Sequence, residues 1–331
     1  MGRLLEVNNL CTSFYTKFGE VKAVNNVSFT LDEGEVLAIV GESGSGKSVT
    51  SMSIMQLVAK GGKIKSGEIL FEGKDIVKMP EKELKTLRGK EISMIFQDPM
   101  TCLNPVFTIG SQMEEVLKLH FKDMSSSDRK KKCLEMLEKV GLSNPEERLK
   151  QYPHELSGGM RQRVMIAMSL LCNPKLLIAD EPTTALDVTI QAQIIDLMKQ
   201  LRKEFKTAII LITHDLGVVA SIADKVNVMY AGEVVESAKA DDLYYSPKHP
   251  YTWGLLKALP KLDMKEDELQ AIPGSTPDLL LEMKGCPFFD RCDYGMECCR
   301  DFKPGVYEAA PGQHIRCFRY HPDFPQGGSH E

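Results

Sequence analysis

The sequence predicts an α/β fold in which a parallel sheet is buried by helices on both faces. Its strands are predicted by four short apolar runs, residues 36–40, 93–96, 176–179 and 208–212. Longer amphipathic segments, typical of surface helices, alternate with these runs. The glycine-rich stretch GESGSGKS directly follows the first run, at the strand-to-helix turn where such sheets bind phosphate groups.

A helical insert is predicted between the second and third runs. Apolar residues recur there at helical spacing in two sets, Met113, Val116, Leu117 and Phe121, and then Cys133, Leu137 and Val140. Gly141 is expected to end the second helix, because glycine readily adopts the left-handed conformation that closes helices. Beyond Thr213 the pattern alternates, and Ala231 and Gly232 predict the turn of a β-hairpin.

The composition changes near Ser246, which divides the chain into residues 1–245 and 246–331. The second part is cut into short pieces by prolines at positions 247, 250, 260, 273, 277, 287, 304 and 311. Pieces of this length cannot build a core of ordinary size. We therefore expect a small extension that is held together by something other than apolar burial.

Length and charge restrict the class of protein. A chain of 331 residues can bury a large core without disulfides. The net charge of −5, with 41 basic and 46 acidic residues intermixed, gives no broad basic surface for nucleic acid. The N-terminus resembles no signal peptide, and no apolar run reaches the roughly 18 residues of a membrane helix. These features predict a soluble cytosolic protein whose thiols stay reduced.

Residues 41–48 match the pattern G-x-x-x-x-G-K-[ST] of a phosphate-binding loop. Backbone N–H groups of such a loop wrap phosphates, Lys47 reaches the β and γ phosphates, and Ser48 offers a hydroxyl to Mg²⁺. A chance glycine-rich turn is the alternative, and the strand before and helix after the motif argue against it. The expected ATP contacts are Gly41, Glu42, Ser43, Gly44, Ser45, Gly46, Lys47, Ser48 and Val49.

Polar residues follow three of the predicted strands. Asp180 suits a Mg²⁺ contact and Glu181 suits the base that polarises the attacking water, although an acid pair before a proline is commonly a helix cap. His214 could position the γ-phosphate, and the amide oxygen of Gln97 could reach Mg²⁺ or water. Beside a phosphate loop the catalytic interpretation of the acid pair is favoured, whereas this histidine and this glutamine, taken alone, would be ordinary structural residues.

The segment ELSGGMRQRVMIAMSLL decides the family. Ser157 is expected to cap a helix, and Gly158 and Gly159 leave backbone N–H groups open to an anion. The helix then has an apolar face formed by Met160, Val164, Ala167, Met168 and Leu171.

Here the chain resembles the ATP-binding cassette (ABC) family, whose LSGGQ signature is matched by Leu156, Ser157, Gly158, Gly159 and Met160. The resemblance implies a P-loop NTPase fold with a RecA-like core, a β subdomain and a helical subdomain at about residues 100–172. It further implies ATP and Mg²⁺ as ligands, Gln97 as the Q-loop, Asp180 and Glu181 as the Walker-B acid and catalytic base, and His214 as the switch histidine. Residues 185–187, with Asp187, would form the D-loop. Phe14 is favoured over Tyr15 to stack on adenine.

In this family two cassettes sandwich ATP between the phosphate loop of one and the signature of the other. A second cassette, identical or paralogous, is therefore an implied partner. The stretches QDPMTCLNPVFTIGSQM and SPKHPYTWGLLKALPKLD resemble the dipeptide and oligopeptide importer ATPases. That resemblance implies two membrane permeases, an extracytoplasmic peptide-binding protein, and a peripheral location on the cytoplasmic face of a prokaryotic membrane. The cargo, whether a peptide or a metal complex, stays open.

Five of the nine cysteines lie between Gly285 and Cys317. Four of them, Cys286, Cys292, Cys299 and Cys317, have the spacing C-x5-C-x6-C-x17-C, which suits either Zn²⁺ or an iron–sulfur cluster, with disulfides as the alternative. The subfamily resemblance favours a [4Fe–4S] cluster, keeps Zn²⁺ second, and prefers Cys299 to its neighbour Cys298. The remaining cysteines, Cys11, Cys102, Cys133 and Cys172, are expected to be small buried hydrophobes.

Two other classes remain as alternatives. A soluble ABC ATPase of ribosomes or DNA usually carries two cassettes, coiled coils or basic arms, which this sequence lacks. A regulatory module that binds nucleotide without hydrolysis would not need the intact Lys47, Glu181 and His214.

Overall fold

The computed structural model describes residues 2–97, 102–184, 186–259 and 272–323. These residues form two compact units, each made of several chain segments. The first unit comprises residues 2–4, 31–36 and 78–212, and the second comprises residues 5–30, 37–77 and 213–323.

The first unit contains three parallel strands, β6 (Ile92–Ile95), β7 (Leu176–Asp180) and β8 (Ala208–Thr213). All residues of these strands are buried, as expected for parallel strands covered on both faces. The apolar runs of the sequence therefore predicted these strands to within about one residue, a normal uncertainty for strand ends.

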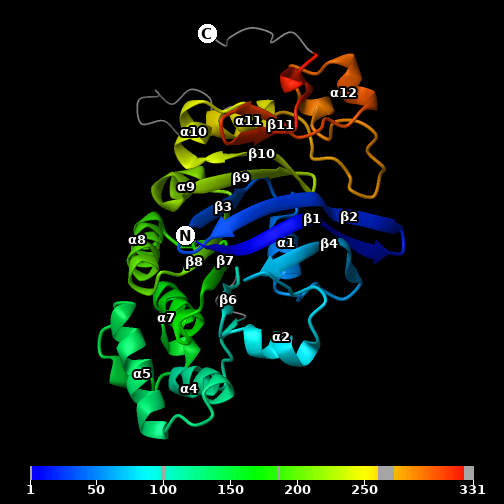
Figure 1. Cartoon of the computed structure of the whole chain (residues 1–331). Helices are drawn as coiled ribbons and strands as arrows, with labels where there is room; N and C mark the ends of the chain where they lie inside the picture. Colours follow the sequence, from blue (N-terminus) through cyan, green and yellow to red (C-terminus); the bar gives the residue numbers. More distant parts are fainter. Residues whose placement is uncertain (1, 98–101, 185, 260–271, 324–331) are drawn as a thin grey trace. The chain divides into compact units, whose positions relative to one another are not determined.

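Helices make up most of the remainder of the first unit (Figure 1). They are α2 (Glu81–Leu87), α4 (Ile109–His120), α5 (Ser126–Lys139), α6 (Pro145–Arg148), the 3-10 turn η1 (Pro153–Glu155), α7 (Gly158–Leu170) and α8 (Val188–Phe205). Helices α4, α5 and α7 pack on one another through residues such as Met113 and Leu137, both fully buried. The predicted helical insert is confirmed, and Gly141 follows α5 with φ of 74°.

The second unit has a mixed sheet. Strand β3 (Val36–Val40) runs parallel to β9 (Lys225–Tyr230), which turns back into β10 (Glu233–Lys239). Ala231 and Gly232 both have positive φ, 48° and 81°, so the predicted hairpin turn is confirmed. A separate antiparallel sheet has the order β2 (Gly19–Asp32), β1 (Arg3–Thr16), β4 (Gly62–Phe71) and β5 (Lys74–Asp75). Helices α1 (Lys47–Ile54) and α9 (Leu216–Ile222) also belong to this unit.

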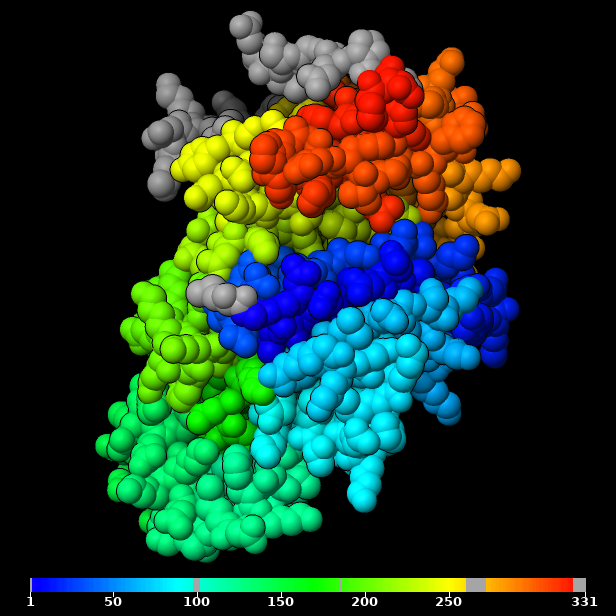
Figure 2. Space-filling model, viewed as in Figure 1, coloured from blue at the N-terminus to red at the C-terminus, as the bar shows by residue number. Residues whose placement is uncertain are grey.

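The C-terminal segment forms short elements packed on the strands of the second unit (Figure 2). Helix α10 (Ala240–Tyr245) precedes the segment, whose own elements are α11 (Pro250–Lys257), η2 (Phe289–Arg291), α12 (Glu297–Asp301), β11 (Tyr307–Ala310), β12 (Gln313–Ile315) and η3 (Phe318–Tyr320). Strand β12 pairs with β10 and so extends the sheet.

Apolar burial contributes more to this segment than the sequence predicted. Tyr251 and Phe288, exposed by 0% and 3%, join the same apolar cluster as Val40 and Val228. The described residues of the segment thus share an apolar core with the preceding strands, so the expectation that something other than apolar burial holds the segment together was wrong. Among the described helices, none combines the length and the apolar character that crossing a bilayer requires.

Candidate active site

The phosphate loop connects β3 to α1 and approaches neighbouring backbone so closely that glycine is required. Gly41 has φ of 151°, and a Cβ there would lie 2.2 Å from the carbonyl oxygen of Met229. Gly46 has φ of 100°, and its Cβ would lie 2.4 Å from the carbonyl oxygen of Ala23. Both positions combine a left-handed backbone with a steric clash, so the glycine pattern of the motif follows from packing.

Lys47 is held at the base of this loop. Its side chain is 6% exposed, and Nζ donates to the carbonyl oxygens of Gly41 and Glu42 at 2.8 and 2.9 Å. Ser45 Oγ is buried without a hydrogen-bond partner among the described residues, while Ser48 is exposed. A buried unpartnered hydroxyl beside a held ammonium group fits a site for an anionic phosphate chain. The Ser48 hydroxyl is of the type that Mg²⁺ accepts in such sites.

Two residues of the C-terminal segment hold the loop in place, and the sequence analysis missed both. The backbone N–H of Glu42 donates to Tyr251 Oη at 2.9 Å. The guanidinium of Arg291 forms a bidentate pair with the Glu42 carboxylate, with Nη1–Oε2 at 2.7 Å and Nη2–Oε1 at 2.9 Å. Since Arg291 directly precedes Cys292, the cysteine segment is linked to the phosphate loop. Partners separated by more than 200 residues leave no local sequence signal.

The carboxyl end of β7 holds a second group of polar residues, in the first unit. Asp180 is 3% exposed, and Glu181 follows it with φ of 47° and donates its N–H to the carbonyl oxygen of Ile212 at 2.8 Å. Glu181 Oε2 accepts from Gln97 Nε2 at 3.0 Å and from Thr184 Oγ1 at 2.8 Å. The structure thus brings Gln97 and Glu181 together, and it adds Thr184, which the sequence analysis did not single out.

The signature residues begin α7. Ser157 caps this helix and accepts from the N–H of Met160 at 3.4 Å, whereas Leu156 is buried. A Cβ on Gly159 would lie 3.0 Å from Ile190 Cγ2, and the N–H of Ile190 donates to Asp187, the cap of α8. Asp187, the predicted D-loop residue, is thus hydrogen-bonded to Ile190, whose side chain lies against Gly159 of the signature.

The structure gives only the exposure and the neighbours of three further predicted residues, His214, Phe14 and Tyr15. His214 is exposed at the end of β8, and Asp215 beside it caps α9. Phe14 is half-buried against Gly62, while Tyr15 is 53% exposed. Residues 98–101 of the loop after Gln97, and Ala185 of the predicted D-loop, lie outside the described residues.

The four cysteines assigned to one cluster line a single small cavity of the second unit. Burial raises the pKa of Cys286 to about 12 and that of Cys317 to about 11, so both are thiols at neutral pH. Cys298 does not line this cavity. Within the described ranges, no three or more His, Cys, Asp or Glu side chains are arranged so that they could hold a metal ion. The donor set suits a thiolate-bound metal centre, but the side chains as placed do not converge on one.

The other cysteines fit the sequence expectation only in part. Cys133 and Cys172 are buried, as predicted, and burial raises both pKa values. Cys102 is exposed and Cys11 is half-buried, so for these two the prediction was wrong. Cys11 lies at an irregularity of the β1–β4 pairing, and its Sγ accepts from the N–H of Asn26.

Comparison with known proteins identifies two families along the chain. The ABC transporter family matches residues 24–184, and the oligopeptide/dipeptide transporter C-terminal region matches residues 235–299. The oligopeptide transport ATP-binding protein OppD of Bacillus subtilis is 57% identical over 98% of this chain and 91% of its own length. The dipeptide transport ATP-binding protein DppD of the same organism is 52% identical over 96% of this chain and 95% of its own length.

Solved structures agree with these sequence matches. The ATP-binding cassette MJ0796, solved as a dimer in a post-hydrolysis state with ADP and phosphate, is 30% identical with a TM-score of 0.65. The alignment covers 72% of this chain and 99% of that one. The α/β architecture, the phosphate loop and the full-length relatives lead to one assignment: the chain belongs to the ABC transporter family, among the ATP-binding proteins of oligopeptide and dipeptide transport.

Proposed function

We propose that this chain hydrolyses ATP to energise the uptake of dipeptides and oligopeptides through separate permease subunits. The observation that carries the proposal is the phosphate loop, in which Lys47 is held by the carbonyl oxygens of Gly41 and Glu42 beside the unpartnered hydroxyl of Ser45. Membership of a family whose relatives are peptide-transport ATP-binding proteins supports the same conclusion.

The proposed roles follow the family resemblance, and the contacts of Lys47 and Glu181 support two of them. Loop N–H groups and Lys47 bind the phosphates, and Phe14 stacks on adenine. Ser48, Gln97 and Asp180 would hold Mg²⁺, which, when bound, neutralises phosphate charge. Glu181 polarises the attacking water, and its contacts with Gln97 and Thr184 support this role because they fix the carboxylate. His214 contacts the γ-phosphate.

A second cassette completes the site in this proposal. The signature, Leu156, Ser157, Gly158, Gly159 and Met160, contacts ATP held by the partner's phosphate loop. The N-terminal turn of α7 supports this role, because Gly158 and Gly159 leave backbone N–H groups accessible to an anion. The dimeric state of the cassette MJ0796 gives further support. In this proposal the two cassettes lie at the cytoplasmic face of the membrane, two permeases span it, and a peptide-binding protein completes the assembly on the extracytoplasmic side.

Purification of the chain with its native membrane components tests this function. Permease subunits in the eluate, together with ATP hydrolysis that depends on Glu181, are the expected result. A Glu181→Gln variant should still bind ATP, and its turnover should fall by roughly 10²- to 10⁴-fold, the usual contribution of a positioned base. Co-purification with ribosomes in place of permeases would reject peptide import.

We also propose that Cys286, Cys292, Cys299 and Cys317 hold a structural [4Fe–4S] cluster, with Zn²⁺ as the second candidate. Their shared cavity supports the proposal, as does the absence of Cys298 from its lining. The four thiolates would link the residues around η2, α12 and the segment after β12 through such a cluster. Because the thiols are protonated at neutral pH, cluster binding would release protons.

Anaerobic purification followed by iron and sulfide assays distinguishes these candidates. We expect four irons and four sulfides per chain, the composition of this cluster type. Cys299→Ser should lower both contents, whereas the adjacent Cys298→Ser should leave them unchanged. Stoichiometric zinc, or equal losses in both variants, would reject the assignment.

A further inference from the structure

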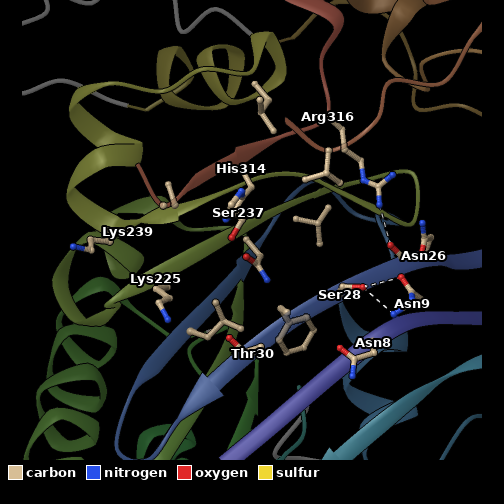
Figure 3. A pocket seen from close by; sticks show the side chains of 18 residues that line it. Asn8, Asn9, Asn26, Ser28, Thr30, Lys225, Ser237, Lys239, His314 and Arg316 are labelled. Carbon is tan, nitrogen blue, oxygen red and sulfur yellow. Dashed lines mark hydrogen bonds between the residues drawn. The ribbon is translucent and has the colours of Figure 1, made fainter. Parts of the chain in front are cut away.

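A cavity of about 600 Å³ lies within the second unit (Figure 3), and no residue of the phosphate loop lines it. Its walls come from β1, β2 and β3, from the hairpin β9–β10, and from β12 with the residues beside it. This volume falls within the range of small-molecule sites. Neither the nucleotide nor the four cysteines account for the cavity.

The charge of the lining is opposite to that of the chain. Lys225, Lys239 and Arg316 line the cavity, and none of the described lining residues is Asp or Glu, although the whole chain carries a net charge of −5. Lys225 and Lys239 are also direct cross-strand partners on β9 and β10. This register places two basic residues at one position of the hairpin.

Two hydrogen-bond donors of the lining have no partner among the described residues. Asn227 is 1% exposed, and its Nδ2 is buried without an acceptor. Arg316 Nε is likewise buried and unpartnered. A buried donor without an acceptor destabilises the fold, so these two donors are a local cost of the residues that form the cavity wall.

The side chains are arranged before any ligand binds. Arg316 Nη2 donates to the carbonyl oxygen of Asn26 at 3.1 Å, which fixes the guanidinium at the cavity wall (Figure 3). On β9, Lys225 and Asn227 are two residues apart and therefore share a face. Their register partners on β10 are Lys239 and Ser237. Cationic and polar groups thus lie side by side on the hairpin.

The lining also has an apolar part, which includes Phe29, Leu37 and Ile315. A bare inorganic ion would leave this surface without contacts, whereas an organic molecule would cover it. We propose that the cavity binds a small organic anion with at least two negative charges, held by Lys225, Lys239 and Arg316.

Carboxylates and phosphates share this chemistry, so the test uses citrate and 2-phosphoglycerate as probes. Each is titrated calorimetrically into the full chain without Mg²⁺ and with saturating ADP, which keeps the phosphate loop occupied. We expect at least one probe to bind with a stoichiometry of one per chain. Failure of both at millimolar concentration would overturn the proposal and leave ATP hydrolysis unaffected.

Variants assign the binding to the cavity. Arg316→Gln and Lys239→Gln should each weaken binding of the probe by about tenfold or more, as expected for loss of a charge-assisted hydrogen bond. Lys74→Gln removes an equal charge from β5, outside the cavity, and should have no effect. Lys239 is exposed, so its variant should fold even if Arg316→Gln does not. Unchanged binding in Lys239→Gln, or equal weakening in Lys74→Gln, would overturn the proposal.

Discussion

Replacement of Arg291 by methionine tests whether the C-terminal segment holds the phosphate loop in shape. The guanidinium side chain is 5% exposed and the Glu42 side chain 29%, so the pair is largely but not fully desolvated. Arg291 Nε also donates to the carbonyl oxygen of Pro273 at 2.8 Å. Its guanidinium lies over the rings of Tyr230 and Phe288.

The expected loss can be estimated from these contacts. Removing one partner of a fully buried ion pair costs about 3–5 kcal/mol, and hydrogen bonds to charged groups contribute about 1.5–3 kcal/mol. Because solvent reaches the Glu42 carboxylate, we expect Arg291→Met to lower the free energy of unfolding by about 2–3 kcal/mol. Part of this loss should appear at the loop, as a roughly three- to tenfold rise in the Kd for ATP.

Denaturant unfolding and ATP titration of four proteins measure the link: the wild type, Arg291→Met, Glu42→Gln and the double variant. Because the two side chains contact each other directly, the cycle should give a coupling of about 1.5–2 kcal/mol. Arg291→Lys, which keeps the charge and loses the bidentate geometry, should lie between the extremes. A coupling near zero, or an unchanged Kd for ATP in Arg291→Met, would refute the proposed link.

Three further predictions concern the phosphate loop and helix α4. In denaturant unfolding, Gly46→Ala should lower the free energy of unfolding by about 3 kcal/mol. Gly44→Ala, whose new Cβ meets nothing within 4 Å, should lower it by only about 1–2 kcal/mol. Equal losses in the two variants would contradict the predicted clash at Gly46. Lys47→Ala should weaken ATP binding by about tenfold or more, and Lys74→Ala should leave it unchanged. Burial lowers the pKa of His120 from 6.5, so the imidazole takes up a proton on unfolding. The free energy of unfolding should therefore fall as the pH drops below about 6.5, and it should fall less steeply in His120→Gln. Equal pH slopes for the wild type and this variant would contradict the prediction.

Local sequence signals predicted the parts of the fold that depend on local physics. Buried strands such as β7 and β8 appear as apolar runs because both faces are covered. Gly141 and the pair Ala231–Gly232 mark the end of a helix and a turn, because few residues accept their backbone angles. The phosphate loop was recognisable for the same reason, since Gly41 and Gly46 lie against neighbouring carbonyl groups.

The features that the sequence did not reveal depend on residues far apart in the chain. The pairing of β12 with β10, the entry of Phe288 into the core, and the contact of Arg291 with Glu42 all join distant segments. Periodicity describes one segment at a time and carries no information on which segments meet. The cavity beside Asn227 and Arg316 was missed for this reason, because its walls come from six strands and no local motif marks them.

Peptide uptake by membrane vesicles containing the complete transporter tests the central claim most directly. ATP and Mg²⁺ are supplied on the side of the membrane where this chain lies. With the wild type, labelled peptide should move from the opposite side and accumulate on the side of this chain. It should not accumulate when both cassettes lack the base. An identical partner then carries Glu181→Gln as well, and a paralogous partner carries the equivalent change. Peptide accumulation at the wild-type rate in the Glu181→Gln transporter would contradict ATP-driven peptide import. So would the absence of peptide accumulation with a wild-type chain that hydrolyses ATP and with intact permeases.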